Sequence, residues 1–314
     1  MNYPYANGII KAQENSILDK AKLIRFTHDT PQAMMRELQE VGYGSPDATN
    51  LEDLITSELT KVKLALEAIA PEPALARLFF VGDDVINLKM LFKRKFFGYH
   101  QDLAYARNGA FKPEDLEAWV DHGVPLPDKG WNRNLASLLT LQAKGLTPRI
   151  LSSRIDSLVI EQVIRSINSV TGKALKVYYE KKTTYINLLS LARARALGWP
   201  REEFQEMLVT GGEISQEKLL ELYPLSDSAL VQELIPFDFG KISQDLKQSF
   251  QKGDLGLLEI IFDNRLLSKM KEYHAEPFTI GPMLYYVLMK KAEATNIRTI
   301  ASNPHFDSQH LLDY

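Results

Sequence analysis

The chain has 314 residues, 45% of them hydrophobic and 25% charged, which is the composition of an ordinary folded globular protein. Lysine and arginine total 37 against 40 aspartates and glutamates; the resulting net charge of −3 argues against a general nucleic-acid binder, which carries a basic excess. Cysteine is absent, so disulfides, thiolate chemistry and cysteine metal sites are excluded.

The amino-terminal stretch MNYPYANGIIKAQ has no basic region followed by an apolar one, as a secretory signal would. No apolar run approaches the roughly 20 residues that a membrane helix needs. We therefore expect a cytoplasmic protein without a membrane span, one that can still associate with a membrane complex.

Two amphipathic helices are predicted in the first third of the chain. Residues 51–70 carry apolar side chains at i, i+3 and i+4 spacing along one stripe, and two prolines follow. Residues 86–98, INLKMLFKRKFFG, mix phenylalanines with cations, a pattern shared by nucleic-acid surfaces and membrane-surface helices. On a helical wheel Lys89, Lys93 and Arg94 lie opposite the apolar stripe. The pattern therefore favours a core helix with a solvated basic face.

The middle of the chain contains a connector and another helix. The Pro/Gly-rich stretch DHGVPLPDKGW, residues 121–131, predicts a connection between structural units. Residues 152–170 repeat the helical spacing, with Ser152 or Ser153 as the candidate N-cap. The TGK stretch at residues 171–173 lacks the glycine and strand of a phosphate loop and predicts a turn that ends this helix.

The last third predicts a break at LIPFDFGK, residues 234–241, and then one or two helices in residues 241–273. Alternating apolar and polar segments of useful length are absent, so we expect an all-α protein. The approximate division is into three helical modules: residues 1–125 with the N-terminal helices, residues 126–234, and residues 235–314 with the C-terminal tail.

The basic helix has copies further along the chain. INLLSLARARALG, residues 186–198, is identical to residues 86–98 at five of thirteen positions, whereas chance gives about one. A weaker third copy, TNIRTIA, occupies residues 295–301. The three copies begin at residues 86, 186 and 295, and such regular spacing predicts a threefold internal repeat of helical modules.

The repeat carries an asparagine in every unit: Asn87, Asn187 and Asn296. Asparagine is a poor residue for the middle of a helix, so its return predicts a shared structural hydrogen bond to a neighbouring helix. Gly98 and Gly198 end the first two copies and suit the left-handed conformation of a helix C-cap.

Two further repeat positions carry charge. Asp84 and Glu293 stand three residues before their asparagines, where the middle copy has Thr184. Lys95 and Arg195 fall in the last helical turn, where we expect them to interact with the free carbonyls of the helix end.

No catalytic constellation is visible. The phosphate-loop, dinucleotide, zinc-protease and nucleophile-elbow motifs are missing, and the six histidines lack ligand spacing. EYHAE, residues 272–276, is typical of a surface helix rather than a metal site. The sequence predicts no catalytic, metal-binding or cofactor-binding residue.

Several segments together resemble the C subunit of the bacterial and archaeal V/A-type rotary ATPases, which is called the d subunit in eukaryotes. The amino-terminal YANGIIKAQENSILDKAKLIRF, followed by ELQEVGYG, is similar to the family's opening pattern. The helices DDVINLKMLFKRK and PMLYYVLMKKAEATNIRTI match through Asp84, Asn87, Leu88 and Lys89, and through Pro282, Tyr286, Lys290, Glu293, Asn296, Ile297 and Arg298. Thr184 and the tail after Ile300, which lacks a basic Gly-Lys turn, depart from the pattern.

The resemblance implies an all-α funnel with a central hole, built from three related helical modules. It implies a non-catalytic subunit without cofactors, present once per complex and monomeric in isolation. Such a subunit sits on the cytoplasmic face of the membrane rotor ring, holds the central shaft subunits, and passes rotation between the ATP-hydrolysing head and the ring. The transported ion, proton or sodium, and the direction of pumping would belong to other subunits.

We expect the polar-face cations of the repeated helices to contact partners: Lys89, Lys93, Arg94, Arg193 and Arg298. Two other interpretations remain. One is an unrelated helical-repeat scaffold that binds protein partners in a groove, with its repeated helices stacked linearly rather than arranged around a hole. The other is an enzyme whose site has no recognised motif.

Overall fold

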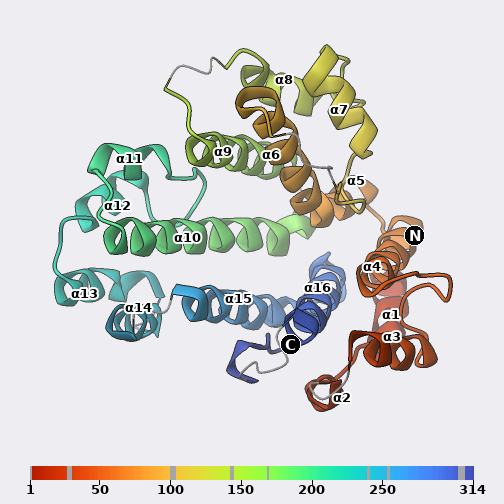
Figure 1. The fold of residues 1–314 in the computed structure, drawn as a ribbon. Coiled ribbons are helices and arrows are strands. Elements are labelled where there is room, and N and C mark those ends of the chain that lie inside the picture. The colour runs from red at the N-terminus through yellow and green to blue at the C-terminus, as the bar shows by residue number, and fades with distance from the viewer. Residues whose placement is uncertain are drawn as a thin grey trace.

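The computed structural model describes residues 2–26, 30–99, 104–141, 145–167, 170–238, 241–252, 255–302 and 308–314. Across these ranges the regular elements are all helices, which confirms the predicted all-α class (Figure 1). The α-helices are α1 (Tyr3–Gln13), α2 (Lys20–Arg25), α3 (Pro31–Glu40), α4 (Leu51–Ile69), α5 (Pro73–Arg77), α6 (Val81–Phe97), α7 (Pro113–His122), α8 (Lys129–Leu139), α9 (Pro148–Ser166), α10 (Lys173–Ala196), α11 (Arg201–Glu206), α12 (Gln216–Leu222), α13 (Asp227–Asp238), α14 (Lys241–Lys252), α15 (Leu255–Lys271) and α16 (Gly281–Ser302). Short 3-10 turns lie between them, among them η4 (Val170–Gly172) and η5 (Glu272–Ala275).

The apolar periodicity of the sequence located the long helices well. The candidate capping residues predicted the helix ends less well. The helix expected over residues 51–70 is α4, and the segment 241–273 forms α14 and α15. The predicted N-cap of α9 at Ser152 or Ser153 is wrong. The helix begins a turn earlier, because the Thr147 hydroxyl accepts the Ile150 amide at 3.2 Å and Pro148 fills the first helical position.

One predicted interruption is corrected and another is confirmed. The TGK stretch starts α10 rather than ending a helix, since η4 leads directly into Lys173 and the Thr171 hydroxyl donates to Glu72 at 2.5 Å. The break predicted at residues 234–241 is confirmed, because α14 begins at Lys241 and α13, which continues through Pro236, ends at Asp238. The buried leucines of α13 pack into the core that α10 to α15 share, which outweighs one missing backbone donor.

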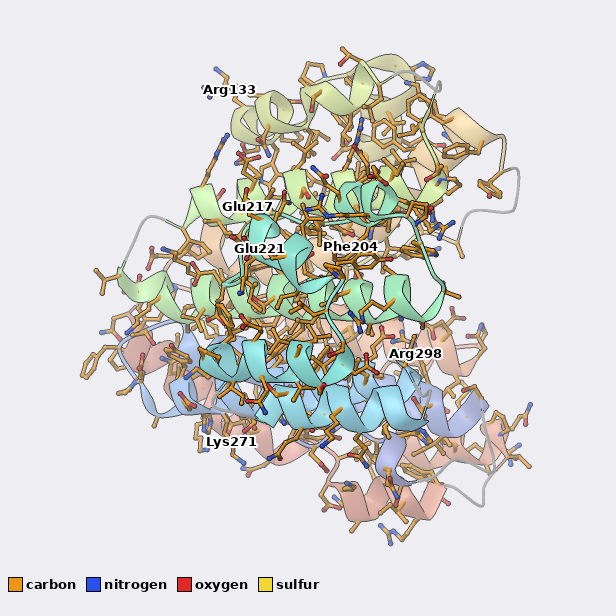
Figure 2. All side chains as sticks on the ribbon, turned by 90° about the vertical axis from the view of Figure 1, so that its left-hand side faces the viewer. Arg133, Phe204, Glu217, Glu221, Lys271 and Arg298 are labelled. Carbon is orange, nitrogen blue, oxygen red and sulfur yellow. The ribbon has the colours of Figure 1, made fainter. Side chains whose placement is uncertain are left out.

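Three hydrophobic cores hold the helices together. The first joins α1 and α5 to α9 with the first halves of α10 and α16. The second surrounds the last half of α10 with α11 to α15, and Phe204 points into it beside Tyr223, with ring centres 4.8 Å apart (Figure 2). The third joins α2, α3 and the start of α4 to the last half of α16. The first core therefore includes parts of all three repeated helices, the second includes part of α10, and the third includes part of α16.

Helix contacts connect the three expected modules, residues 1–125, 126–234 and 235–314, whose boundaries stay a prediction. The N-terminal helices α1 and α4 pack against α16, at the opposite end of the chain (Figure 1). Helix α9 packs on α6, and α15 packs on α10, so contacts cross both expected boundaries. The chain closes on itself through its two ends.

The repeats lie on α6, α10 and α16, and their asparagines make the same pair of hydrogen bonds. Each side chain is fully buried, donates to one backbone carbonyl and accepts the amide of that same residue. The bonded residue is Ala106 for Asn87 (2.8 and 2.9 Å), Val209 for Asn187 (2.8 and 2.9 Å) and Leu312 for Asn296 (3.0 and 2.7 Å). These partners lie on the segment that follows each helix, not on a neighbouring helix as the sequence suggested.

The side chain three residues before the repeated asparagine also accepts backbone amides from the segment that follows the helix. Asp84 accepts the amides of Ala110 and Phe111 at 2.7 and 3.1 Å. Thr184 accepts the Glu213 amide at 2.8 Å through its hydroxyl, so the departure from an acid keeps the interaction. A glycine allows the approach in each case: a Cβ on Gly109 would lie 2.1 Å from Asp84 Oδ1, and one on Gly212 would lie 3.1 Å from the Thr184 hydroxyl.

Lys95 and Arg195, in the last turns of α6 and α10, bind backbone carbonyls at the end of a different helix. Lys95 donates to Val120 in the last turn of α7 at 2.6 Å. Arg195 donates to Tyr223 and Leu225 after α12 at 2.7 and 2.6 Å. The expectation that these cations serve the carbonyls of their own helix is therefore wrong. Gly98 and Gly198 do adopt positive φ, 65° and 62°, as helix ends require.

Candidate partner-binding cavity

A large open cavity lies between α4, α6, α16 and the segment that follows α6. Its volume is about 1550 Å³. The walls include Thr56 and Thr60 of α4, Ile86 of α6, and Thr295 and Arg298 of α16. Ile86 is 51% exposed, although it stands on a core helix, because its side chain faces this space. Two of the three repeated helices thus line one cavity.

The size of the cavity suits a protein segment. Pockets for small molecules usually enclose about 300–1,000 Å³. Three turns of an α-helix about 10 Å in diameter occupy roughly 1300 Å³. The volume of the cavity therefore exceeds that of three helical turns.

Charged side chains of both signs continue from the cavity, which Asp83 and Lys291 line, across the repeated helices. We call these six residues the charged ring: Lys89, Asp156, Lys182, Asp263, Lys291 and Asp83. Lys89 of α6 binds Asp156 of α9 at 2.7 Å. Lys182 of α10 interacts electrostatically with Asp156 and with Asp263 of α15. Lys291 of α16 is attracted by Asp83 of α6 and repelled by Lys182 of α10, so electrostatic interactions connect α16 to both of these helices.

Protein surrounds these groups, yet their side chains stay at least partly accessible to solvent. Burial lowers the pKa of Lys291 to about 8, although its ammonium group donates to the Phe79 carbonyl at 2.6 Å. Burial raises the pKa of Asp263 to about 6, and Lys182 opposes this shift. Asp263 is nevertheless exposed, and Lys182 and Lys291 are half-buried. This combination is typical of a concave, partly hydrated wall.

Four of the five cations predicted to contact partners are engaged within the chain. Lys89 binds Asp156, and Arg193 binds Glu259 at 2.9 Å. Arg94 binds Glu117 at 2.7 Å and also contacts Asp121. Arg298 holds Glu52 through two hydrogen bonds of 2.5 and 2.8 Å at the cavity wall. Lys93 has no ion pair within the part of the chain that the structure describes.

Sequence reasoning missed the cavity and most of the charged ring. Lys182 and Lys291 both stand five residues before a repeated asparagine, so aligning the repeats further upstream could have found them. The first copy has Gly82 at this position, which hid the pattern. Asp156 and Asp263 lie on α9 and α15, outside the repeats, and had no sequence signal.

The described residues contain no group of three or more histidine, cysteine, aspartate or glutamate side chains arranged to hold a metal ion. Among them, no helix combines the length and the apolar character needed to cross a membrane. The features that stand out are the cavity and its charged wall.

The sequence model of one protein family matches residues 6–303, nearly the whole chain. That family is described as the ATP synthase (C/AC39) subunit. The fold defines a class of protein: an all-helical chain with three copies of one unit, a helix whose asparagine binds the backbone of the segment that follows it. This chain belongs to the ATP synthase (C/AC39) subunit family, which confirms the resemblance drawn from the sequence.

Curated relatives agree with this assignment. The chain is 29% identical over 128 residues to the A-type ATP synthase C subunit of Thermococcus gammatolerans, a match that covers 40% of this chain and 34% of the relative. It is 31% identical over 117 residues to that of a Desulfurococcus species (37% and 31%), and 26% over 158 residues to that of Methanothermobacter thermautotrophicus (48% and 41%). The matched regions thus span about a third to two fifths of each relative's length.

Proposed function

We propose that this chain is the non-catalytic central-stalk subunit of a V/A-type ATPase, which couples the rotating shaft to the membrane rotor ring during ATP-driven ion transport or ATP synthesis. Membership of the C/AC39 family supports the assignment to such a complex. The observation that carries the coupling role is the cavity of about 1550 Å³ between the repeated helices α6 and α16.

The shape that we propose is a funnel of three related units around a central opening. The equivalent asparagine bonds on α6, α10 and α16 support three related units. The charged ring supports a central opening, because its interactions pass from α6 through α9 and α10 to α16 and back to α6, with α15 joined to α10. A linear stack of repeats would leave its first and last helices apart.

The proposed occupant of the cavity is the end of the central shaft. The cavity wall carries charges of both signs, among them Glu52, Asp83, Lys291 and Arg298. They favour a polar helix end over an apolar plug, since buried charges need paired partners. Lys93 is the predicted contact cation that remains without an ion pair in the described residues, so it is our first candidate for an outer contact. The paired cations Lys89, Arg94, Arg193 and Arg298 would contact partners by sharing or exchanging their carboxylates.

We further propose that the protein is peripheral, held on the cytoplasmic face of the membrane through the rotor ring. The lack of a membrane-crossing helix in the described residues is compatible with this position. One copy per complex is what a single central shaft requires.

The cavity assignment is tested by filling the space without disturbing the core. Ile86→Trp places a large ring in the cavity, whereas Val124→Trp makes the same kind of change at a residue between α7 and α8; both residues are 51% exposed. We expect Ile86→Trp to weaken binding of purified shaft subunits at least about tenfold, and Val124→Trp to leave it unchanged. Equal affinities for the two variants, both folded by circular dichroism, would reject the cavity as the shaft site.

A further inference from the structure

An exposed phenylalanine stands at the tip of a tight turn between η5 and α16. Phe278 is 71% exposed. The Thr279 amide donates to the Glu276 carbonyl at 3.2 Å, which closes a four-residue turn. Pro277 occupies the second position of this turn, where the fixed φ of proline is favourable, and Phe278 occupies the third. The backbone of the turn therefore holds the phenylalanine in its exposed position.

Helix α1 fastens this turn from the inside. The side-chain amide of Asn7 donates to the Pro277 carbonyl at 2.8 Å and to the Thr279 carbonyl at 3.0 Å, on both sides of Phe278. Asn7 itself is only 7% exposed. An aromatic side chain on a backbone that is already fixed loses little conformational freedom when a partner binds. Phe278 thus has the properties of a preformed anchor for another protein.

Other segments of the chain meet at the same place. The Ile280 amide, two residues after Phe278, donates to the Thr171 carbonyl of η4 at 3.2 Å. The hydroxyl groups of Thr171 and Tyr3 both donate to Glu72 Oε1, at 2.5 and 2.6 Å. These bonds join α1, the segment before α5, η4 and the start of α16. In Figure 1 the N-terminus, α5 and the start of α10 accordingly lie on one side of the molecule.

Exposed apolar residues gather beside these bonds. We call them the apolar patch: Pro4, Pro73, Val170, Pro277 and Phe278. Val170 is 88% exposed. Single exposed apolar residues are ordinary, whereas a group of them from several joined segments marks an interaction surface. The exposed charges next along the chain to Val170 and Phe278 are Lys173 and Glu276, which have opposite signs. The surface is therefore apolar and neutral.

The apolar patch and the cavity lie at opposite ends of the same two helices. The cavity is lined by residues between 52 and 61 of α4 and between 291 and 298 of α16. The apolar patch adjoins the end of α4 and the start of α16. At 1.5 Å per residue, Thr295 lies about 21 Å along α16 from its first residue, Gly281. A partner in the cavity and a second partner on the apolar patch can therefore bind at the same time.

We propose that the apolar patch docks this chain on the rotor ring, where Phe278 packs between aromatic side chains at the water-facing rim of the ring. The inference rests on the proposed function and gives the coupling subunit its second contact surface. Membrane proteins carry tryptophan and tyrosine where their helices reach the water interface. Such side chains pack closely on proline and on another aromatic ring.

A lipid surface matches the apolar patch less well than the ring does. Peripheral binding to lipid combines apolar side chains with several lysines or arginines, which meet anionic headgroups. The five residues of the apolar patch include no cation. A neutral, apolar surface is instead complementary to the neutral, aromatic rim of a membrane protein.

Affinities of the purified chain for the detergent-solubilised rotor ring and for purified shaft subunits test the docking. We expect Phe278→Ser to weaken ring binding at least about thirtyfold, the loss typical of a central interface aromatic, and to leave shaft binding unchanged. Val170→Ser, which does not touch the turn, should weaken ring binding at least about fivefold. The matched control is Leu197→Ser at the end of α10, where the side chain is 66% exposed; it should change neither affinity.

The outcomes separate the docking surface from the proposed function. Ring binding that is unchanged in both Phe278→Ser and Val170→Ser would overturn the docking surface and leave the coupling role intact. A wild-type chain that binds the shaft but not the ring would reject the coupling role, and the docking surface with it. Vesicles of neutral and anionic lipid without the ring form the third arm. If they capture the wild type but not Phe278→Ser, the apolar patch binds lipid and its assignment to the ring is wrong.

Discussion

Asn187 shows what a single repeated side chain contributes. Its amide group satisfies both backbone groups of Val209 inside the protein, where an unpaired donor or acceptor costs about 1–3 kcal/mol. Asn87 and Asn296 do the same for Ala106 and Leu312. The repeated asparagines fix the path of the chain after each helix.

Replacing Asn187 by alanine should therefore lower the free energy of unfolding by about 2–4 kcal/mol, because two buried backbone groups lose their partner. Chemical denaturation measures the change. Gln232→Ala removes an amide side chain from an exposed position on α13 and should change the stability by less than about 0.5 kcal/mol. A loss in Asn187→Ala as small as in this control would contradict the proposed clamp.

Asp84 gives the protein a pH-dependent stability. Burial raises its pKa from 3.8 to about 7, although it accepts two backbone amides. A raised carboxyl pKa stabilises the fold most below pH 3.8, and this contribution disappears as the pH rises through 7. The free energy of unfolding should fall by roughly 1–4 kcal/mol more between pH 5 and 8 in the wild type than in Asp84→Asn. Parallel pH profiles for the two proteins would show that Asp84 titrates normally.

For single residues, the sequence predicted which positions matter better than it predicted their hydrogen-bond partners. The spacing of the repeats singled out the asparagines, yet their partners lie 19, 22 and 16 residues away, so no fixed spacing identifies them. Thr184 departed from the acid of the other copies. Its hydroxyl still accepts a backbone amide, an equivalence that only the contact reveals.

Helix α10 carries two arginines, Arg193 and Arg195, that differ in exposure and in hydrogen-bond partners. Arg195 is 17% exposed and binds two carbonyls and Asp227, whereas Arg193 is 46% exposed and, among the described residues, its side chain binds Glu259 alone. Arg195→Met should cost roughly 2–3 kcal/mol of stability, because it detaches the end of α12 from α10. Arg193→Met should cost less than about 1 kcal/mol, as exposed ion pairs do. Thermal denaturation of the two variants compares them directly, and equal shifts would contradict the assigned role.

The helices themselves were predictable where their apolar stripes are long, as in α4 and α15. Their ends were less predictable, because distant contacts decide them. Thr171 meets Glu72, 99 residues away, and this contact accompanies the start of α10 where the local sequence indicated a helix end. Buried leucines stabilise α13, which continues through Pro236 and ends inside the break predicted at residues 234–241.

For the whole molecule, the order of helices along the chain does not give their grouping in space. The N-terminal helices complete the core around α16, so a division by sequence position separates elements that pack together. The charged ring has the same origin: its residues come from five helices and meet only after the chain has closed. This explains why the sequence indicated a non-catalytic repeat protein but did not reveal the cavity.

The central claim is that this chain links the shaft to the rotor ring of a V/A-type ATPase. The most direct measurement is a pull-down of the tagged chain from detergent-solubilised membranes, with the bound proteins identified by mass spectrometry. We expect shaft and rotor-ring proteins together, and release of the chain with the soluble part when the complex is dissociated. Recovery of the chain alone, alongside intact ATPase complexes that lack it, would contradict the account.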